Sequence, residues 1–188
     1  MKKQNTLSRS AGIVAVVTLL LLMIPFIAMQ FTREVDWGAG DFLIMAALLF
    51  STGMAYVLLN RSSTDLAFKL AAAICMGTTF LMIWTNLAVG LIGAGPNAAN
   101  LMFIAVIFVL IISAVRSGFT AFGMEKTMYA TALSLAVLAV IALLGNMDQY
   151  PGTSAKEIIG ICGFFAGLYA IAGALFHYAG KGRMVQGV

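Results

Sequence analysis

The chain has 188 residues, of which 62% are hydrophobic and only 10% are charged. Average soluble domains contain roughly 45–50% apolar and about 25% charged residues, so this composition excludes an ordinary soluble protein and indicates an integral membrane protein. The formal net charge is +4 at pH 7, but the chain has no basic domain that would bind nucleic acid.

Six hydrophobic runs each approach the length of about 20 residues that a helix needs to cross the hydrocarbon core of a bilayer. They cover approximately residues 11–30, 41–59, 67–92, 99–118, 127–145 and 157–178. The connections between them are too short to hold a soluble domain. We therefore predict an all-α fold in which residues 1–188 form a single transmembrane domain, an integral membrane bundle of six transmembrane helices.

The first run follows Lys2, Lys3 and Arg9, as the hydrophobic region of a signal peptide would. Such a region is normally about 7–15 residues long and ends at a small-x-small cleavage site. This run is longer, and no convincing site of that kind follows it. We interpret it as a retained first helix, which Pro25 is expected to bend near its outer end.

The distribution of basic residues predicts how the helices are oriented, because cytoplasmic loops of membrane proteins are enriched in lysine and arginine. With a cytoplasmic N-terminus, the outer face receives only two basic residues, Arg33 and Lys156. The inner face then holds the other nine: Lys2, Lys3, Arg9, Arg61, Lys69, Arg116, Lys126, Lys181 and Arg183. We therefore expect both termini in the cytoplasm, and the basic inner face in contact with anionic inner-leaflet lipid.

The third run is longer than the bilayer core requires and extends from Lys69 to Gly93. Asn86 lies roughly two turns below Gly93, deep enough that an unpaired amide would cost free energy. We expect it to have a partner, either a backbone carbonyl, a hydroxyl such as that of Thr79 or Thr85, or an amide of a neighbouring helix. A glycine- and proline-containing turn should follow this helix.

Polar side chains gather at the predicted outer face. The candidate site there consists of Asp36, Trp37, Asp41, Asn86, Asn97 and Asn100. If the outer loops converge, these residues form an acidic, amide-rich rim that would bind a cation or a polar head group. In the alternative interpretation, Asp41, Asn97 and Asn100 cap helix N-termini, and Trp37 lies in the aromatic belt.

The sixth run begins with a capping box, in which Ser154 is followed three residues later by Glu157. Small residues then recur at spacings of three and four, which predicts a smooth helix-packing face. This stripe consists of Gly160, Gly163, Gly167, Ala170 and Ala174. Its partner is either a helix of the same chain, a second copy of the chain, or another membrane protein.

Several absences limit the chemistry of the chain. No ionisable residue falls in the middle of a predicted span, which disfavours an ion-coupled transporter. The single histidine, His177, is expected to be an interfacial residue, and no catalytic or phosphate-binding motif is present. Cys75 and Cys162 are expected at different depths, which argues against a disulfide between them. We therefore predict no cofactor, no metal site and no enzymatic activity.

The segments VDWGAGDF and WTNLAVGLIGAGPNAANLMF resemble a family of uncharacterised small bacterial inner-membrane proteins. The shared pattern is VDW followed by DF, and NLAVG-x-IG followed by N-x-AN-LM. The resemblance supports the multi-pass topology and implies no activity. Relatives carry acidic residues just before the N-x-AN element, where this chain has Gly95 and Pro96, which weakens the case for a cation site there.

These observations favour a non-enzymatic binding or accessory membrane protein with a polar rim on the periplasmic side. Its partners would be the lipid bilayer and, through the sixth helix, another membrane protein or a second copy of the chain. The alternative is a facilitator or channel for small solutes, with Asn86, Thr85 and Thr79 lining the bundle interior. A channel needs a continuous polar path, and the inner halves of the helices offer no obvious file of hydroxyl groups.

Overall fold

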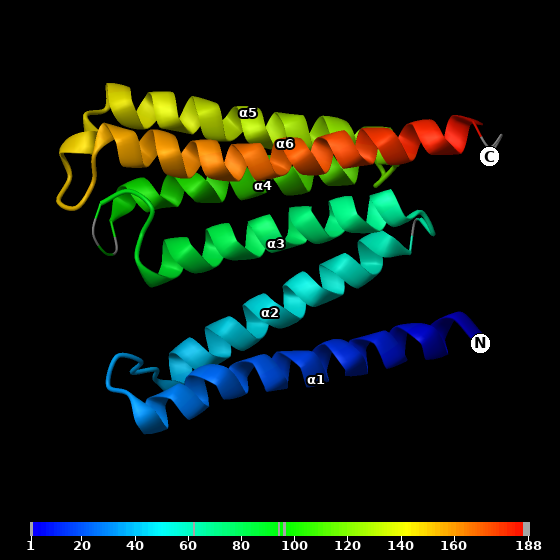
Figure 1. Ribbon diagram of the computed structural model, residues 1–188, viewed down its shortest axis with the longest axis horizontal. Coiled ribbons are helices and arrows are strands. Elements are labelled where there is room, and N and C mark those ends of the chain that lie inside the picture. The colour runs from blue at the N-terminus through cyan, green and yellow to red at the C-terminus, as the bar shows by residue number, and fades with distance from the viewer. Residues whose placement is uncertain (1, 62, 94, 96, 186–188) are drawn as a thin grey trace. The chain divides into compact units, whose positions relative to one another are not determined.

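The structure is a computed structural model that describes residues 2–61, 63–93, 95 and 97–185. The described residues contain helices and turns and no β-strand. Six of the described helices are long and apolar enough to cross a membrane (Figure 1). The predicted all-α fold with six spans is therefore confirmed, and the chain is a multi-pass membrane protein. Pro96, part of the predicted turn, lies outside the described residues.

The contacts divide the chain into two compact units, Met1–Leu58 and Leu59–Val188, whereas we predicted one domain. Unit 1 contains α1 (Lys2–Phe31) and most of α2 (Ala39–Asn60). The α1 helix includes Pro25 and begins well before the hydrophobic run that predicted it. Inside this unit, a Cβ atom at Gly53 would lie only 2.7 Å from a methyl group of Val14, so the absence of a side chain allows close approach.

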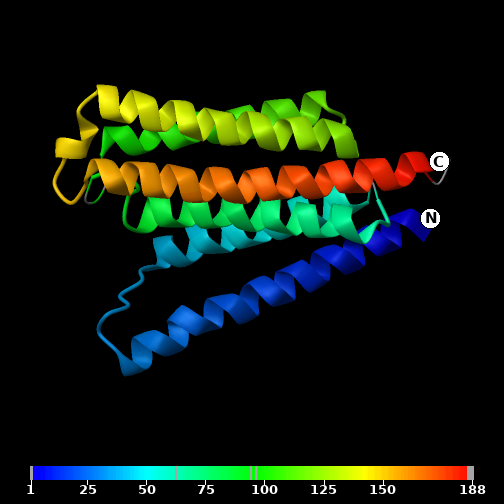
Figure 2. The same ribbon diagram turned by 45° about the horizontal axis from the view of Figure 1, so that its top comes forward.

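Unit 2 contains four long helices and two short 3-10 helices. In chain order these are α3 (Leu66–Ala88), η1 (Ala98–Leu101), α4 (Met102–Arg116), α5 (Ala121–Leu144), η2 (Met147–Gln149) and α6 (Ala155–Val185). The closely packed pairs are α5 with α6, α3 with α6, and α4 with α5 (Figure 2). In space, α6 therefore contacts both α3 and α5, and α5 also contacts α4. Consecutive helices α3 and α4 are not a closely packed pair.

The core of unit 2 forms where α6 faces α3 and α5. Tyr169 and Phe176 of α6 are fully buried, as are Phe68 of α3 and Met128 of α5. The rings of Phe68 and Phe176 meet edge to face with their centroids 5.0 Å apart, a geometry that aromatic pairs prefer. Large side chains therefore fill the interior of this unit.

Two of the helix boundaries that differ from the predicted spans have a clear local cause, and one predicted boundary signal is confirmed. The α3 helix ends at Ala88, because Gly90 adopts a positive φ of 77° that interrupts helical geometry. The α5 helix begins at Ala121, earlier than predicted, because the Thr120 side chain accepts a hydrogen bond from the Gly123 N–H and caps it. The predicted capping box of α6 is present.

In that box, the Ser154 N–H donates to the Glu157 carboxylate at 2.7 Å, and the Glu157 N–H donates to the Ser154 hydroxyl at 3.3 Å. The reciprocal bonds satisfy two backbone donors at the start of α6. This end of α6 therefore follows from its local sequence alone.

The small-residue stripe of α6 is not used to pack unit 2. Cβ atoms placed at Gly160, Gly163 and Gly167 meet no atom of unit 2 within 4 Å. The α6 helix packs instead through Gly173 and Gly180 on another face. A Cβ at Gly173 would lie 3.2 Å from Met128 and Tyr129, and one at Gly180 would lie 2.8 Å from the Phe122 ring. Ala170 and Ala174 belong to the same stripe, and Ala174 is exposed.

Candidate functional site

The connection between α3 and α4, residues 89–97, is a glycine loop that turns the chain back on itself. Gly90, Gly93 and Gly95 have φ angles of 77°, 74° and 78°, values that glycine adopts readily and other residues rarely do. The Gly95 N–H donates to the Val89 carbonyl at 3.2 Å and closes the loop. Side chains at Gly90 and Gly93 would also collide with neighbouring amides, because a Cβ atom at Gly90 would lie 2.8 Å from Asn100 and one at Gly93 would lie even closer to Asn97.

The side chain of Asn100 holds this loop together. Its Oδ1 accepts hydrogen bonds from the backbone N–H groups of Leu91 and Ile92, each at 2.9 Å. Its Nδ2 lies within hydrogen-bonding distance of the carbonyls of Ile92 and Gly95, at 3.2 and 3.4 Å. The alternative interpretation, in which Asn100 caps a helix N-terminus, is wrong for this residue. The amide instead points back into the loop and satisfies backbone groups that are buried there.

Asn97 has the capping role that the alternative interpretation gave it. Its Oδ1 accepts a hydrogen bond from the Ala99 N–H at 2.7 Å, at the start of η1. Its Nδ2 donates to the Ile92 carbonyl at 2.6 Å. On the opposite side of the loop, the Gly93 N–H donates to the Thr153 hydroxyl at 2.5 Å. The glycine loop is thus tied both to η1 and to the connection between α5 and α6.

Asn86 lies on the last turn of α3, and only one of its two polar side-chain atoms has a hydrogen-bond partner. Its Nδ2 donates to the Asn100 backbone carbonyl at 3.1 Å, which is one of the partners we predicted. Its Oδ1 is buried and has no hydrogen-bond partner. An unsatisfied buried acceptor costs about 1–3 kcal/mol, so this oxygen is a place where a ligand donor would stabilise the protein.

A pocket of about 420 Å³ lies beside these amides, between the end of α3 and the start of α4. Its polar lining consists of Asn86, Asn97 and Asn100. The remaining lining is apolar or glycine: Met82, Ile83, Leu87, Ala88, Val89, Gly90, Gly95, Leu101, Phe103, Ile104 and Ile107. The pocket therefore combines hydrophobic walls with a small amide cluster, which is a common design of binding sites for small molecules.

Within unit 2, the structure brings together Asn86, Asn97 and Asn100 of the predicted outer-face site. Asp36, Trp37 and Asp41 belong to unit 1 and do not line the pocket. The Asp41 carboxylate accepts a hydrogen bond from the Gly38 N–H at 2.8 Å at the start of α2, in agreement with the predicted capping role. Trp37 packs edge to face on Phe42 with ring centroids 5.3 Å apart.

Two polar contacts between helices of unit 2 were not predicted from the sequence. The Tyr169 and Thr79 hydroxyls are 2.9 Å apart and join α6 to α3 within the buried interior. His177 Nδ1 lies 3.0 Å from the Glu125 carboxylate, which joins α6 to the first turns of α5. Nothing in the local sequence marks these pairs, because their members are 90 and 52 residues apart.

Among the described residues, no group of three or more His, Cys, Asp or Glu side chains is placed to hold a metal ion. Cys75 and Cys162 are free and buried. Comparisons with protein-family models, curated proteins and solved structures found no match for this chain. Function must therefore be argued from the pocket.

Proposed function

We propose that this protein is a non-enzymatic binding protein of the bacterial inner membrane, which holds a membrane amphiphile in the pocket between α3 and α4. The positive-inside rule supports cytoplasmic termini and places the pocket at the periplasmic face. The resemblance to small inner-membrane proteins agrees with this location. One observation carries the proposal, namely the apolar pocket beside the Asn86 amide at the end of two membrane-spanning helices.

The size and lining of the pocket support this role. Sites for small molecules commonly have volumes of about 300–1,000 Å³, apolar walls and a few polar groups that fix orientation. The pocket, at about 420 Å³, lies in that range. Leu87 of α3 and Ile104 of α4 line it and are 62% and 43% exposed. An alkyl chain in the bilayer would meet these side chains without crossing a polar barrier.

The alternative of a channel finds less support in unit 2. A conducting path needs continuous polar lining. The hydroxyl groups of Thr79 and Thr85 both bond to carbonyls of their own helix, and Thr79 also pairs with the buried Tyr169. Met82 and Phe103, which line the pocket, are buried. The interior of this unit is thus packed with large side chains.

Filling the pocket tests the proposal. Ala88→Phe places a ring among the lining residues at the end of α3. Ala73→Phe makes the same change at an exposed position earlier on α3, outside the pocket lining, and serves as the matched control. The measurement is native mass spectrometry of the full-length protein purified in mild detergent, with lipids that remain bound counted per chain.

We expect the wild type and Ala73→Phe to retain bound lipid and Ala88→Phe to lose it, with affinity reduced about tenfold or more, equivalent to about 1.4 kcal/mol. Equal retention by all three proteins would contradict the proposal. Absence of any bound lipid on the wild type, even when lipid is added back, would contradict it as well.

A further inference from the structure

The hydrogen bonds of the three pocket asparagines differ in one respect. Both side-chain polar atoms of Asn97 and Asn100 have protein partners. The Nδ2 of Asn86 also has one. Only its Oδ1 is without a partner among these six atoms, and that atom is buried. The amide cluster therefore lacks one hydrogen-bond donor, which would pair with the Asn86 Oδ1 atom.

The orientation of the Asn86 amide is determined by its own hydrogen bond. If its oxygen and nitrogen were exchanged, an amide oxygen would face the Asn100 carbonyl oxygen at the same distance of 3.1 Å. Two acceptors at that separation repel each other, so only the orientation with Nδ2 toward the carbonyl is stable. The unpartnered atom is consequently the oxygen.

The charges of the pocket lining restrict the ligand further. None of the lining residues is a lysine, arginine, aspartate or glutamate. A head group that offers only a phosphate or a carboxylate to the pocket would find no cationic side chain there, and it also lacks the donor that Asn86 requires. The polar end that fits is a hydroxyl, an amine or an ammonium group that donates a hydrogen bond.

The apolar part of the ligand is indicated by where the pocket opens. Leu87, Leu101 and Ile104 line the pocket and are 62%, 63% and 43% exposed. All three belong to segments that are apolar enough to lie in a membrane. Exposed apolar side chains in such segments contact lipid chains. The pocket thus presents an apolar wall toward the bilayer, and Asn86, which carries the unpartnered acceptor, is one of its lining residues.

We infer that the bound amphiphile is a lipid whose head group carries an N–H or O–H donor, and that this donor bonds to Asn86 Oδ1 while an acyl chain lies along Leu87 and Ile104. The inference rests on the proposed function and adds the chemical class of the ligand. It predicts discrimination between lipids of equal net charge that differ only in whether their head groups donate hydrogen bonds.

Phosphatidylethanolamine and phosphatidylcholine with identical acyl chains provide this comparison. Both are zwitterionic, but only the ethanolamine head group has N–H donors. The experiment titrates each lipid into the purified full-length protein in detergent and follows binding by native mass spectrometry and by thermal unfolding, since a bound ligand stabilises the folded state. We expect phosphatidylethanolamine to bind about tenfold more tightly than phosphatidylcholine.

Two leucine substitutions identify the responsible group. Asn86→Leu removes the acceptor and should make the two lipids bind alike. Asn60→Leu is the matched control, because Asn60 precedes α3, lies outside the pocket lining and also has a buried side-chain amide without a partner. This variant should keep the wild-type preference for phosphatidylethanolamine.

Equal binding of the two lipids by the wild type would overturn the inference and leave the proposed function standing. A preference that persists in Asn86→Leu would overturn it also, because the donor would then bond elsewhere. Binding of neither lipid would overturn the proposed function itself. The wild-type comparison stands even when Asn86→Leu fails to fold.

Discussion

Asn100 is the residue on which the shape of the pocket depends most. Its Oδ1 accepts from two consecutive backbone N–H groups, those of Leu91 and Ile92, and both of these residues are buried. Because the loop backbone there lacks access to water, removal of the amide leaves two donors without partners. The loop geometry, and with it the pocket, should therefore be sensitive to this single side chain.

Asn100→Ala is expected to destabilise the folded protein by about 2 kcal/mol or more, since each buried group left unsatisfied costs about 1–3 kcal/mol. Hydrogen exchange measured by mass spectrometry should show faster exchange in residues 89–97. Gln149→Ala, at an exposed position in the connection between α5 and α6, is the control. Unchanged exchange in the loop of Asn100→Ala would show that the amide does not hold it.

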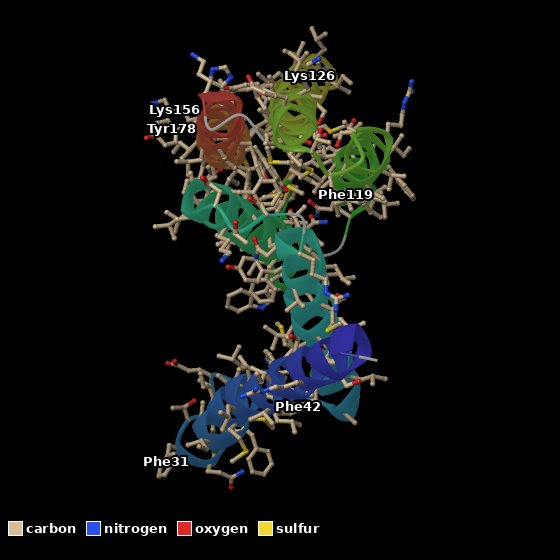
Figure 3. All side chains as sticks on the ribbon, turned by 90° about the vertical axis from the view of Figure 1, so that its right-hand side faces the viewer. Phe31, Phe42, Phe119, Lys126, Lys156 and Tyr178 are labelled. Atoms are coloured by element: carbon tan, nitrogen blue, oxygen red, sulfur yellow. The ribbon has the colours of Figure 1, made fainter. Side chains whose placement is uncertain are left out.

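The hydroxyl pair of Thr79 and Tyr169 is the clearest polar link between two helices inside unit 2. Tyr169→Phe removes it without changing the ring, so we expect a loss of about 0.6–2 kcal/mol in unfolding free energy, as for other hydrogen bonds between membrane helices. Tyr178→Phe is the control because Tyr178 is 71% exposed and points away from the neighbouring helices of unit 2 (Figure 3). An equal effect of both variants in unfolding assays would refute this assignment.

At the scale of single residues, the sequence predicted that a buried amide needs a hydrogen-bond partner better than it predicted the backbone path that supplies the partners. The expectation that Asn86 has a partner is confirmed, and a backbone carbonyl is one of its predicted partners, although α3 ends at Ala88 and Asn86 lies on its last turn. The role of Asn100 could not be predicted, because it depends on three positive φ angles that bring residues 91 and 92 back to it. Sequence spacing describes regular helices well, whereas it does not determine the path of a glycine loop.

At the scale of elements, hydrophobic length was sufficient to locate all six membrane helices. It failed at the end of α3, where an apolar run continues into a loop that contains buried apolar side chains. Leu91 and Ile92 are as apolar as a helix would require, and they are buried although they lie outside α3. An apolar sequence indicates that side chains are buried in protein or lipid, but it does not indicate whether the backbone is helical. In this segment only the glycines indicate that the helix ends.

The α6 helix provides a matched test of which glycine face packs. Gly173→Val introduces a branched side chain against Met128 and Tyr129, and overpacking of this kind costs about 1–3 kcal/mol. Gly163→Val makes the same change on the open stripe, where the stability of unit 2 should be unaffected. Both variants alter helix propensity equally, so the difference between their unfolding free energies measures the packing. A larger loss for Gly163→Val would contradict the packing described for α6.

At the scale of the whole molecule, the positive-inside rule predicts a topology that reporter fusions can check. A reporter active only in the periplasm should be inactive after Val188 and active when inserted at Gly152, in the connection between α5 and α6. A fluorescent reporter that folds only in the cytoplasm should give the opposite pattern. Activity of the periplasmic reporter at the C-terminus would reverse the proposed orientation and place the pocket at the cytoplasmic face.

The central claim is that a lipid occupies the pocket between α3 and α4, and photo-crosslinking in native membranes tests it most directly. A phosphatidylethanolamine analogue with a photoreactive group in its acyl chain would be incorporated and activated by light, and the adducts mapped by peptide mass spectrometry. We predict that adducts concentrate between Met82 and Ile107, which bound the pocket lining. Adducts spread evenly over exposed apolar positions of α5, such as Leu133, Val137 and Val140, would contradict the claim.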